Sequence, residues 1–177
     1  MKTHLKLAAA VALAACAATA AWAQGASDWK PSKPVRIIVP IVGSTNDVLA
    51  RLIGPKLQEA LGQPFVVENK PGAGGNIGAY EVSRAAPDGH TLLIGYNGPL
   101  AINVTLFDKM PYDPTKDLAP ITLAVKSPQY LVVNPATGIT DVKDFIAKAR
   151  ANPTKYAYGS VAMGSASHLT MEMMKSG

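Results

Sequence analysis

VRIIV at residues 35–39 is a short β-branched run, a pattern that predicts a buried strand. FVV at residues 65–67 and TLLI at residues 91–94 predict two further strands. Between the strands, apolar residues recur every three or four positions over residues 47–61 and again over a short stretch at residues 80–85, which indicates two helices. Strand, helix, strand, helix, strand is the order that builds a parallel sheet with right-handed crossovers. The predicted fold class is therefore α/β with a mostly parallel sheet.

The chain beyond residue 95 predicts further helices and strands, and a second α/β unit is expected to begin near Lys126. A short helix is expected within residues 97–106, and the Pro- and Asp-rich residues 110–120 predict a loop. We expect Thr140 to cap a helix over residues 142–149, and Ser165 or a neighbour to start a last helix. Three further strands are predicted at residues 121–125, 130–133 and 156–158.

These elements suggest a division of the chain into domains. Only one strand-helix-strand element follows Lys126, which is too little for a second unit to close its own core. We therefore predict a first α/β domain at residues 24–125, largely present, and the truncated start of a second at residues 126–177.

The first 23 residues have the features of a cleaved signal peptide. Lys2 and Lys6 form a positive region, residues 7–21 are small or apolar, and Ala21-Trp22-Ala23 is a small-x-small cleavage pattern. The apolar run is too short to span a bilayer. We expect a periplasmic protein, although Leu13-Ala14-Ala15-Cys16 also fits lipoprotein cleavage, which would leave a lipid anchor on Cys16; we favour the soluble form.

Composition excludes several classes of function. Cys16 is the only cysteine, so the mature protein would have no disulfide, no cysteine metal site and no thiol nucleophile. Removing Lys2 and Lys6 lowers the formal net charge from +5 to +3, and the remaining basic residues are scattered. A nucleic acid partner is not expected. His90 and His168 are not spaced as metal ligands, so we predict neither a metal nor another cofactor.

Three loops that follow strands and enter helices are the candidate binding regions: residues 41–47, 71–78 and 160–168. In open parallel sheets, ligands bind beyond the carboxyl ends of the strands, where helix starts favour an anion. The glycine-rich residues 72–78 do not match the dinucleotide pattern, because Ile77 stands where G-x-G-x-x-G needs its third glycine. A tight turn that lets a helix pack against the sheet and direct ligand contact both remain open for this segment.

An enzyme is the competing interpretation for the segment Ser165-Ala166-Ser167-His168. Gly164 directly precedes Ser165, which does not form G-x-S-x-G, and a catalytic histidine normally comes from elsewhere in the chain. We therefore favour Ser165 as a helix cap over Ser165 as a nucleophile. Asp47, with Ser44, Thr45 and Asn46, has a similar interpretation as a helix cap followed by a first-turn acid.

Five segments together resemble one family of receptors. The chain contains PIVGSTNDVLAR from Pro40, VVENKPGAGGNIGA from Val66, AAPDGHTLLIG from Ala85, MPYDPTKDLAPIT from Met110 and GSASHL from Gly164. In this order they resemble the TctC or Bug family, the extracytoplasmic receptors of tripartite tricarboxylate transporters. The resemblance runs from about Trp29 to the end of the chain.

The resemblance implies a type II periplasmic binding protein of the Venus-flytrap kind, nearly twice as long as this chain. Such a receptor is not an enzyme: it closes on a small carboxylate and delivers it to the large and small subunits of a membrane transporter. A sensor that presents its ligand to a signalling protein is the alternative. The residues implied at the ligand are Gly43, Ser44, Thr45, Asn46 and Asp47 on one wall, Ser160, Ser165, Ala166, Ser167 and His168 on the other, with Asn97 and Gly98 beside them.

Overall fold

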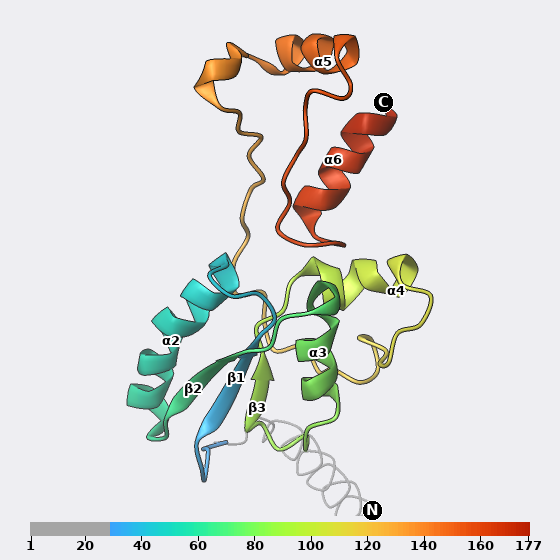
Figure 1. Ribbon diagram of the computed structural model, residues 1–177. Coiled ribbons are helices and arrows are strands. Elements are labelled where there is room, and N and C mark those ends of the chain that lie inside the picture. The colour runs from blue at the N-terminus through green and yellow to red at the C-terminus, as the bar shows by residue number, and fades with distance from the viewer. Residues whose placement is uncertain (1–28) are drawn as a thin grey trace, which may run out of the picture. The chain divides into compact units, whose positions relative to one another are not determined.

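A three-stranded parallel sheet is the centre of the fold, as the sequence predicts. The computed structural model describes residues 29–177. Strand β1 (Val35–Val39) lies between β2 (Phe65–Asn69) and β3 (Thr91–Leu93), and both pairings are parallel (Figure 1). In this register Ile37 is opposite Val67 on one side and Leu92 on the other. The central strand is the most apolar one because it is covered on both faces.

Two helices cover the opposite faces of the sheet. Side chains alternate along a strand, so Ile37 and Val39 point to one face and Ile38 to the other. Helix α2 (Thr45–Leu61) covers the first face. Helix α3 (Asn76–Ser83) covers the second, where Gly78 lies against Ile38. The core under α2 comprises Ile37, Val39, Ala50, Phe65, Val67 and Ile94.

An ion-pair cluster holds α3 on the sheet. Arg36 Nε donates to Glu68 Oε1 over 2.7 Å, and the same guanidinium contacts Glu81 on α3. Lys70 adds a contact to Glu81 at 3.4 Å. The two carboxylates raise the pKa of Arg36, and its hydrogen bonds lower the pKa of both glutamates. Because these groups are partly exposed, water screens the pairs and the cluster fixes the position of α3 more than it stabilises the fold.

The segment after β3 turns back along the end of α3. It forms a π-helical turn (Gly98–Ile102) and helix α4 (Asn103–Leu106). Earlier in the chain, a 3-10 turn (Ala73–Gly75) leads into α3. Residues 110–120 form the predicted loop. Tyr112 fastens this loop, because its buried hydroxyl donates to the carbonyl of Pro99 over 2.7 Å.

The three strands predicted beyond residue 120 are not formed. Residues 121–125, 130–133 and 156–158 carry no strand assignment, and most of their side chains are exposed. A strand needs a neighbour for its backbone groups, and none pairs with these segments within residues 29–177. The prediction of these three strands is therefore wrong, because a β-branched run favours extended backbone but does not by itself provide a paired neighbour.

The helices predicted beyond residue 126 are formed. A 3-10 turn (Pro135–Thr137) precedes helix α5 (Val142–Ala151), and helix α6 (Ala166–Ser176) is the last element. The cap of α5 is Asp141, whose carboxylate accepts from the N–H of Asp144 over 2.8 Å. The prediction of Thr140 as the cap is therefore wrong by one residue, since a carboxylate at the next position reaches the third amide of the helix.

Residues 32–177 form one compact unit. The predicted signal peptide and the lipoprotein alternative at Cys16 lie outside the described residues. Across the described part of the chain, no helix is both long and apolar enough to cross a membrane.

Candidate functional site

The carboxyl ends of the three strands are tied together by polar side chains. Asn46 Nδ2 donates to the carbonyl of Gly95 over 2.8 Å, which links the start of α2 to the end of β3. Asn69 Nδ2 donates to Asp47 Oδ1 over 3.0 Å, which links the end of β2 to the same turn. The loop after β1 is thereby fixed at the sheet edge where ligands of open parallel sheets bind.

The first turn of α2 leaves backbone donors unused. Gly43 has a positive φ of 67°, and Ser44 Oγ accepts from the N–H of Asp47 over 3.3 Å as the helix cap. The carboxylate of Asp47 reaches back and accepts from the N–H of Gly43 over 2.9 Å. No hydrogen bond among the described residues uses the N–H groups of Thr45 and Asn46, as is usual at a helix start. These two donors are available to an anion.

Asp47 is a structural residue of this turn. Only 6% of it is exposed, and its Oδ1 also lies 3.1 Å from Arg51 Nη2. The hydrogen bonds from Asn69 and Gly43 lower its pKa, with a smaller contribution from Arg51. Its carboxylate is therefore ionised and already bound by the protein's own donors, which leaves the neighbouring amides to act on a ligand.

The first turn of α6 repeats this arrangement in the second half of the chain. Gly164 has a positive φ of 74°, and Ser165 Oγ accepts from the N–H of His168 over 3.2 Å. His168 stands where Asp47 stands in α2, and its Nδ1 accepts from the N–H of Gly164 over 3.4 Å. The N–H groups of Ala166 and Ser167 have no partner among the described residues. GSTND and GSASH thus build two like turns, one at each helix.

The helix-cap interpretation of Ser165 is confirmed. Its hydroxyl lies 3.0 Å from Ser167 Oγ and 3.4 Å from the N–H of Ala162, and the side chain is buried. The ring of His168 contacts Gly164 through Nδ1, whereas Ser165 contacts only the backbone of His168. This arrangement does not provide the hydroxyl-to-imidazole hydrogen bond of a nucleophile and its base.

The remaining predicted residues lie in different surroundings. Asn97 and Ser160 are exposed, whereas Gly98 is buried, with room for no side chain between Tyr96 and the carbonyl of Gly164. Within residues 29–177, no hydrogen bond or ion pair joins the Gly43–Asp47 turn to residues 160–168. The two predicted walls are thus each formed as a turn, and their meeting around a ligand stays a prediction.

A buried amide network was missed by sequence reasoning. Asn103 Nδ2 donates to Asn76 Oδ1 over 2.6 Å and to the carbonyl of Gly74 over 2.9 Å. The hydroxyl of Tyr96 donates to the same carbonyl over 2.8 Å. Asn103 Oδ1 faces Gly164 and is buried without a hydrogen-bond partner in the described part of the chain. An asparagine among the apolar residues on either side of it at positions 99–104 was the signal that could have revealed it.

The glycine-rich segment acts as a packing turn. A Cβ on Gly78 would lie 3.0 Å from the carbonyl of Lys70 and 3.3 Å from Ile38, so glycine lets α3 approach the sheet closely. The carbonyl of Gly74 is used by Tyr96 and Asn103. These contacts confirm that residues 71–78 form a tight packing turn, and direct contact of this segment with a ligand stays a prediction.

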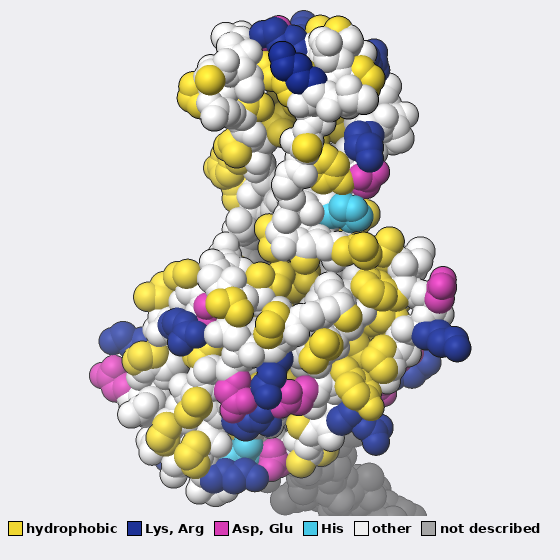
Figure 2. All heavy atoms as spheres, viewed as in Figure 1, with side chains coloured by type: hydrophobic (Ala, Val, Ile, Leu, Met, Phe, Trp, Pro, Cys, Tyr) yellow, Lys and Arg dark blue, Asp and Glu magenta, His cyan; other side chains and the backbone are white. Residues whose placement is uncertain are grey.

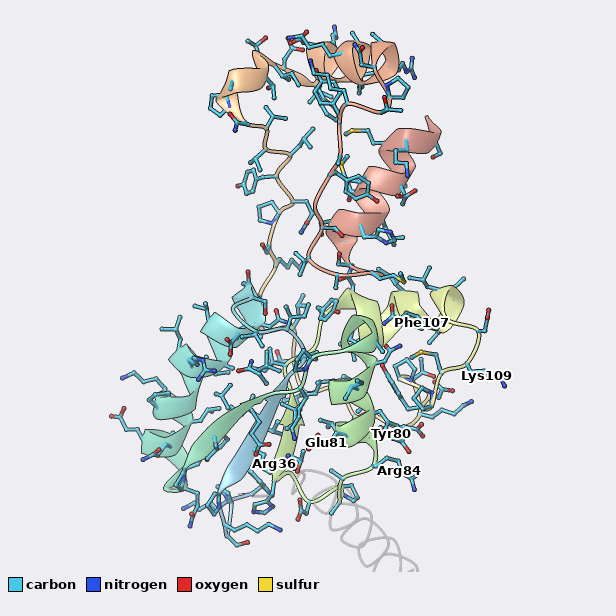
Figure 3. All side chains as sticks on the ribbon, in the orientation of Figure 1. Arg36, Tyr80, Glu81, Arg84, Phe107 and Lys109 are labelled. Carbon is cyan, nitrogen blue, oxygen red and sulfur yellow. The ribbon has the colours of Figure 1, made fainter. Side chains whose placement is uncertain are left out.

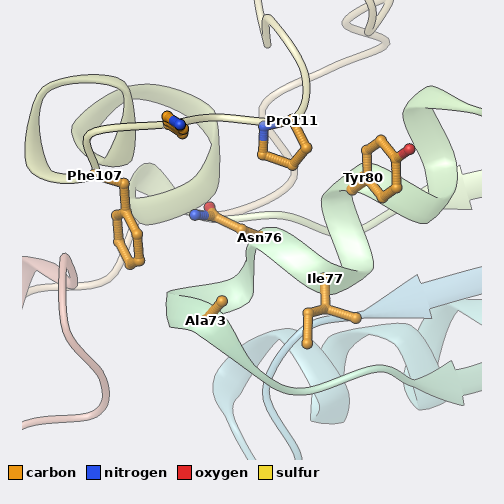
Figure 4. A pocket seen from close by; sticks show the side chains of 7 residues that line it. Ala73, Asn76, Ile77, Tyr80, Phe107 and Pro111 are labelled. Carbon is orange, nitrogen blue, oxygen red and sulfur yellow. The ribbon is translucent and has the colours of Figure 1, made fainter.

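An apolar groove shares no residue with either turn. It has a volume of about 200 Å³ and lies between α3 and the segment after α4 (Figure 4). Its lining residues are Ala73, Asn76, Ile77, Tyr80, Phe107, Lys109 and Pro111. None of the predicted ligand residues belongs to it. Among the described residues, no three His, Cys, Asp or Glu side chains are grouped as they would be around a metal ion.

Comparison with known proteins gives a consistent result. Residues 49–177 match the model of the "Tripartite tricarboxylate transporter family receptor". Protein BugT of Bordetella pertussis is 38% identical over 151 residues, which cover 84% of this chain and 46% of BugT. The chain therefore spans about half the length of the curated relatives it matches.

Solved structures agree with the predicted fold. The structure of R. palustris Rpa4515 with adipate has a TM-score of 0.79 and 40% identity, over 84% of this chain and 50% of that one. MatC from Rhodopseudomonas palustris with bound malate has a TM-score of 0.76 and 33% identity, over 82% and 50%. A structure described as a periplasmic transporter has a TM-score of 0.72 and 40% identity, over 82% and 49%. The α/β fold of periplasmic binding proteins is thereby confirmed.

Proposed function

The chain belongs to the tripartite tricarboxylate transporter receptor family, and from this premise we propose that it is part of a periplasmic receptor for a small carboxylate. In this proposal the receptor holds its ligand without changing it chemically. It then hands the ligand to the membrane subunits of the transporter. Relatives solved with adipate and malate support a ligand with carboxylate groups.

The observation that carries the proposal is the pair of like first turns at α2 and α6. In each turn the hydroxyl of the capping serine accepts from the third N–H of the helix. The first two N–H groups are left for a ligand. A carboxylate needs such donors, and the positive end of the helix dipole adds about 0.3–1 kcal/mol for each turn. We propose that one carboxylate is held by these amides, with the walls at Gly43–Asp47 and at residues 160–168 closing around it.

The two turns differ in charge, which ranks them as carboxylate sites. The anionic Asp47 lies behind the α2 turn and would repel a carboxylate, although Arg51 at 3.1 Å offsets part of its charge. His168 takes the same place at α6 and brings no negative charge. We therefore expect the amides of Ala166 and Ser167 to contribute more to carboxylate binding than those of Thr45 and Asn46.

Backbone nuclear magnetic resonance of the isotope-labelled chain tests this function, because it detects weak binding amide by amide. Addition of adipate or malate is expected to shift the amide signals of Ala166 and Ser167, and to a smaller extent those of Thr45 and Asn46. The diamide of adipic acid, which has the same length and no charge, is the matched control and is expected to leave them in place. Equal shifts with acid and diamide, or shifts confined to other regions, would refute the proposal.

A further inference from the structure

The apolar groove beside α3 is the most conspicuous feature that the carboxylate site does not use. Ile77 and Tyr80, one turn apart on α3, are 51% and 42% exposed, and Phe107 and Pro111 face them across the groove (Figure 4). Figure 2 shows apolar side chains gathered over α3 and α4 with lysine and arginine side chains at the border. We call the surface formed by Ala73, Ile77, Tyr80, Phe107 and Pro111 the α3 groove.

The size and lining of the α3 groove do not suit a small-molecule ligand. Its volume of about 200 Å³ is below the roughly 300–1,000 Å³ of typical ligand pockets. The only side-chain polar groups in its lining belong to Asn76, Tyr80 and Lys109. Asn76 is already engaged by Asn103 and Tyr112. A shallow apolar recess of this kind fits one anchoring side chain of a protein partner.

Two cations stand at the groove without a negative partner. Lys109 is part of the lining, and Arg84 follows Tyr80 by four residues, which places it on the same side of α3 (Figure 3). Neither makes an ion pair with any residue in 29–177. The nearby acid Glu81 is bound to Arg36 and Lys70. The exposed Asp108 is the neighbour of Lys109 in the chain and makes no ion pair with it.

We propose that the α3 groove is a docking site for a polypeptide segment of another protein that presents a bulky apolar side chain flanked by carboxylates. The apolar anchor fills the recess between Ile77 and Phe107, and the flanking carboxylates pair with Lys109 and Arg84. This complementarity determines the orientation of the partner and its rate of association. The inference goes beyond the carboxylate site and does not depend on it.

The charges favour this occupant over two others. Attachment to an anionic lipid surface commonly uses a cluster of about four to eight basic residues, whereas two cations flank the groove. A symmetric pair of copies would place the cations of one groove opposite those of the other, and these like charges would repel. A segment that brings its own carboxylates satisfies both cations.

Photo-crosslinking of the full chain in its native host tests the proposal. A benzophenone amino acid replaces Ile77 in the groove, and in a separate variant it replaces Leu52, which is 66% exposed on α2. We expect position 77 to capture a peptide of another protein that contains a bulky apolar residue and at least one carboxylate, as identified by mass spectrometry. Position 52 is expected not to capture it.

Charge reversal supplies the second measurement. Combining Arg84→Glu with Lys109→Glu is expected to lower the yield of that crosslink about tenfold. Lys126→Glu with Lys143→Glu, the same charge change at exposed lysines outside the groove, is expected to leave it unchanged. Capture of lipid, of a second copy or of the chain itself, no capture above the level at position 52, or an unchanged yield after reversal in the groove would each overturn the inference.

Discussion

Tyr112 shows how a single side chain fixes the loop that follows α4. Its hydroxyl donates to the carbonyl of Pro99, and it lies 3.3 Å from Asn76 Oδ1, which also accepts from Asn103. All these groups are buried. A buried acceptor has lost its hydrogen bonds to water, so it destabilises the folded state when its donor in the protein is removed. Removing the Tyr112 hydroxyl is therefore expected to weaken this network.

Tyr112→Phe is expected to lower the free energy of unfolding by about 1–2 kcal/mol, because the carbonyl of Pro99 loses its donor. Urea denaturation near neutral pH measures this. Tyr130→Phe is the matched control, since Tyr130 is 81% exposed and its loss of a hydroxyl is expected to change nothing measurable. An equal effect of both substitutions would contradict the role assigned to Tyr112.

The same hydroxyl gives a pH dependence with a defined sign. Burial, together with the nearby Tyr96, raises the pKa of Tyr112 to about 12. Because the folded pKa is above the unfolded value near 10, the contribution of Tyr112 is complete below about pH 10 and is lost as the pH rises through about 12. Thermal melts across this range are expected to fall less steeply for Tyr112→Phe than for the unchanged chain.

At the scale of elements, the turns GSTND and GSASH show that one short pattern gives the same local structure twice. In both, the glycine has a positive φ and the serine hydroxyl accepts from the third N–H of the helix. The side chain of that third helical residue, Asp47 or His168, accepts from the N–H of the glycine. The sequence predicts these turns because caps depend on neighbours in the chain and not on distant contacts.

Ser165→Ala is expected to destabilise α6 by about 0.5–2 kcal/mol, because the N–H of His168 loses its acceptor. Hydrogen exchange of the α6 amides measures this local opening. Ser165→Asp is expected to retain most of the stability, since aspartate also caps helices. Ser160→Ala, at an exposed serine outside the turn, is the control. A similar loss for Ser160→Ala and Ser165→Ala would refute the capping argument.

The parts of the candidate site that sequence reasoning could not reach depend on long-range contacts. Asp47 was recognised as a first-turn acid, but its bond to Asn69 joins residues 22 positions apart. Asn103 meets Gly74 and Asn76 across a separation of more than 25 residues. Local patterns predict turns and periodicity, whereas such pairings follow only from the packed fold.

Across the described part of the molecule, the buried apolar residues are concentrated around the parallel sheet. The buried apolar residues are mainly those of β1 and its helices, whereas residues 121–133 present a row of apolar side chains to solvent. Leu123 and Val132 are 70% and 82% exposed. An apolar β-branched segment whose backbone groups lack a neighbouring strand is a site of self-association.

Leu123→Lys combined with Val132→Lys is therefore expected to raise the concentration at which the chain stays soluble, without lowering its melting temperature. Light scattering during concentration, together with thermal denaturation, measures both effects. Val48→Lys combined with Leu52→Lys, at exposed apolar residues of α2, is the matched control and is expected to change solubility less. If the two variants were equally soluble, the exposed segment would not be the cause of association.

Gly164 packs so closely against Asn103 that its α-hydrogen cannot be replaced by a larger group without moving one of the two segments. A Cβ on Gly164 would lie 2.1 Å from Asn103 Oδ1, so even a methyl group there would work as a wedge between the loop that begins α6 and the buried amide. A single substitution such as Gly164→Ala would thus force these two segments apart. Glycine at residue 164 therefore sets how closely the start of α6 approaches Asn103.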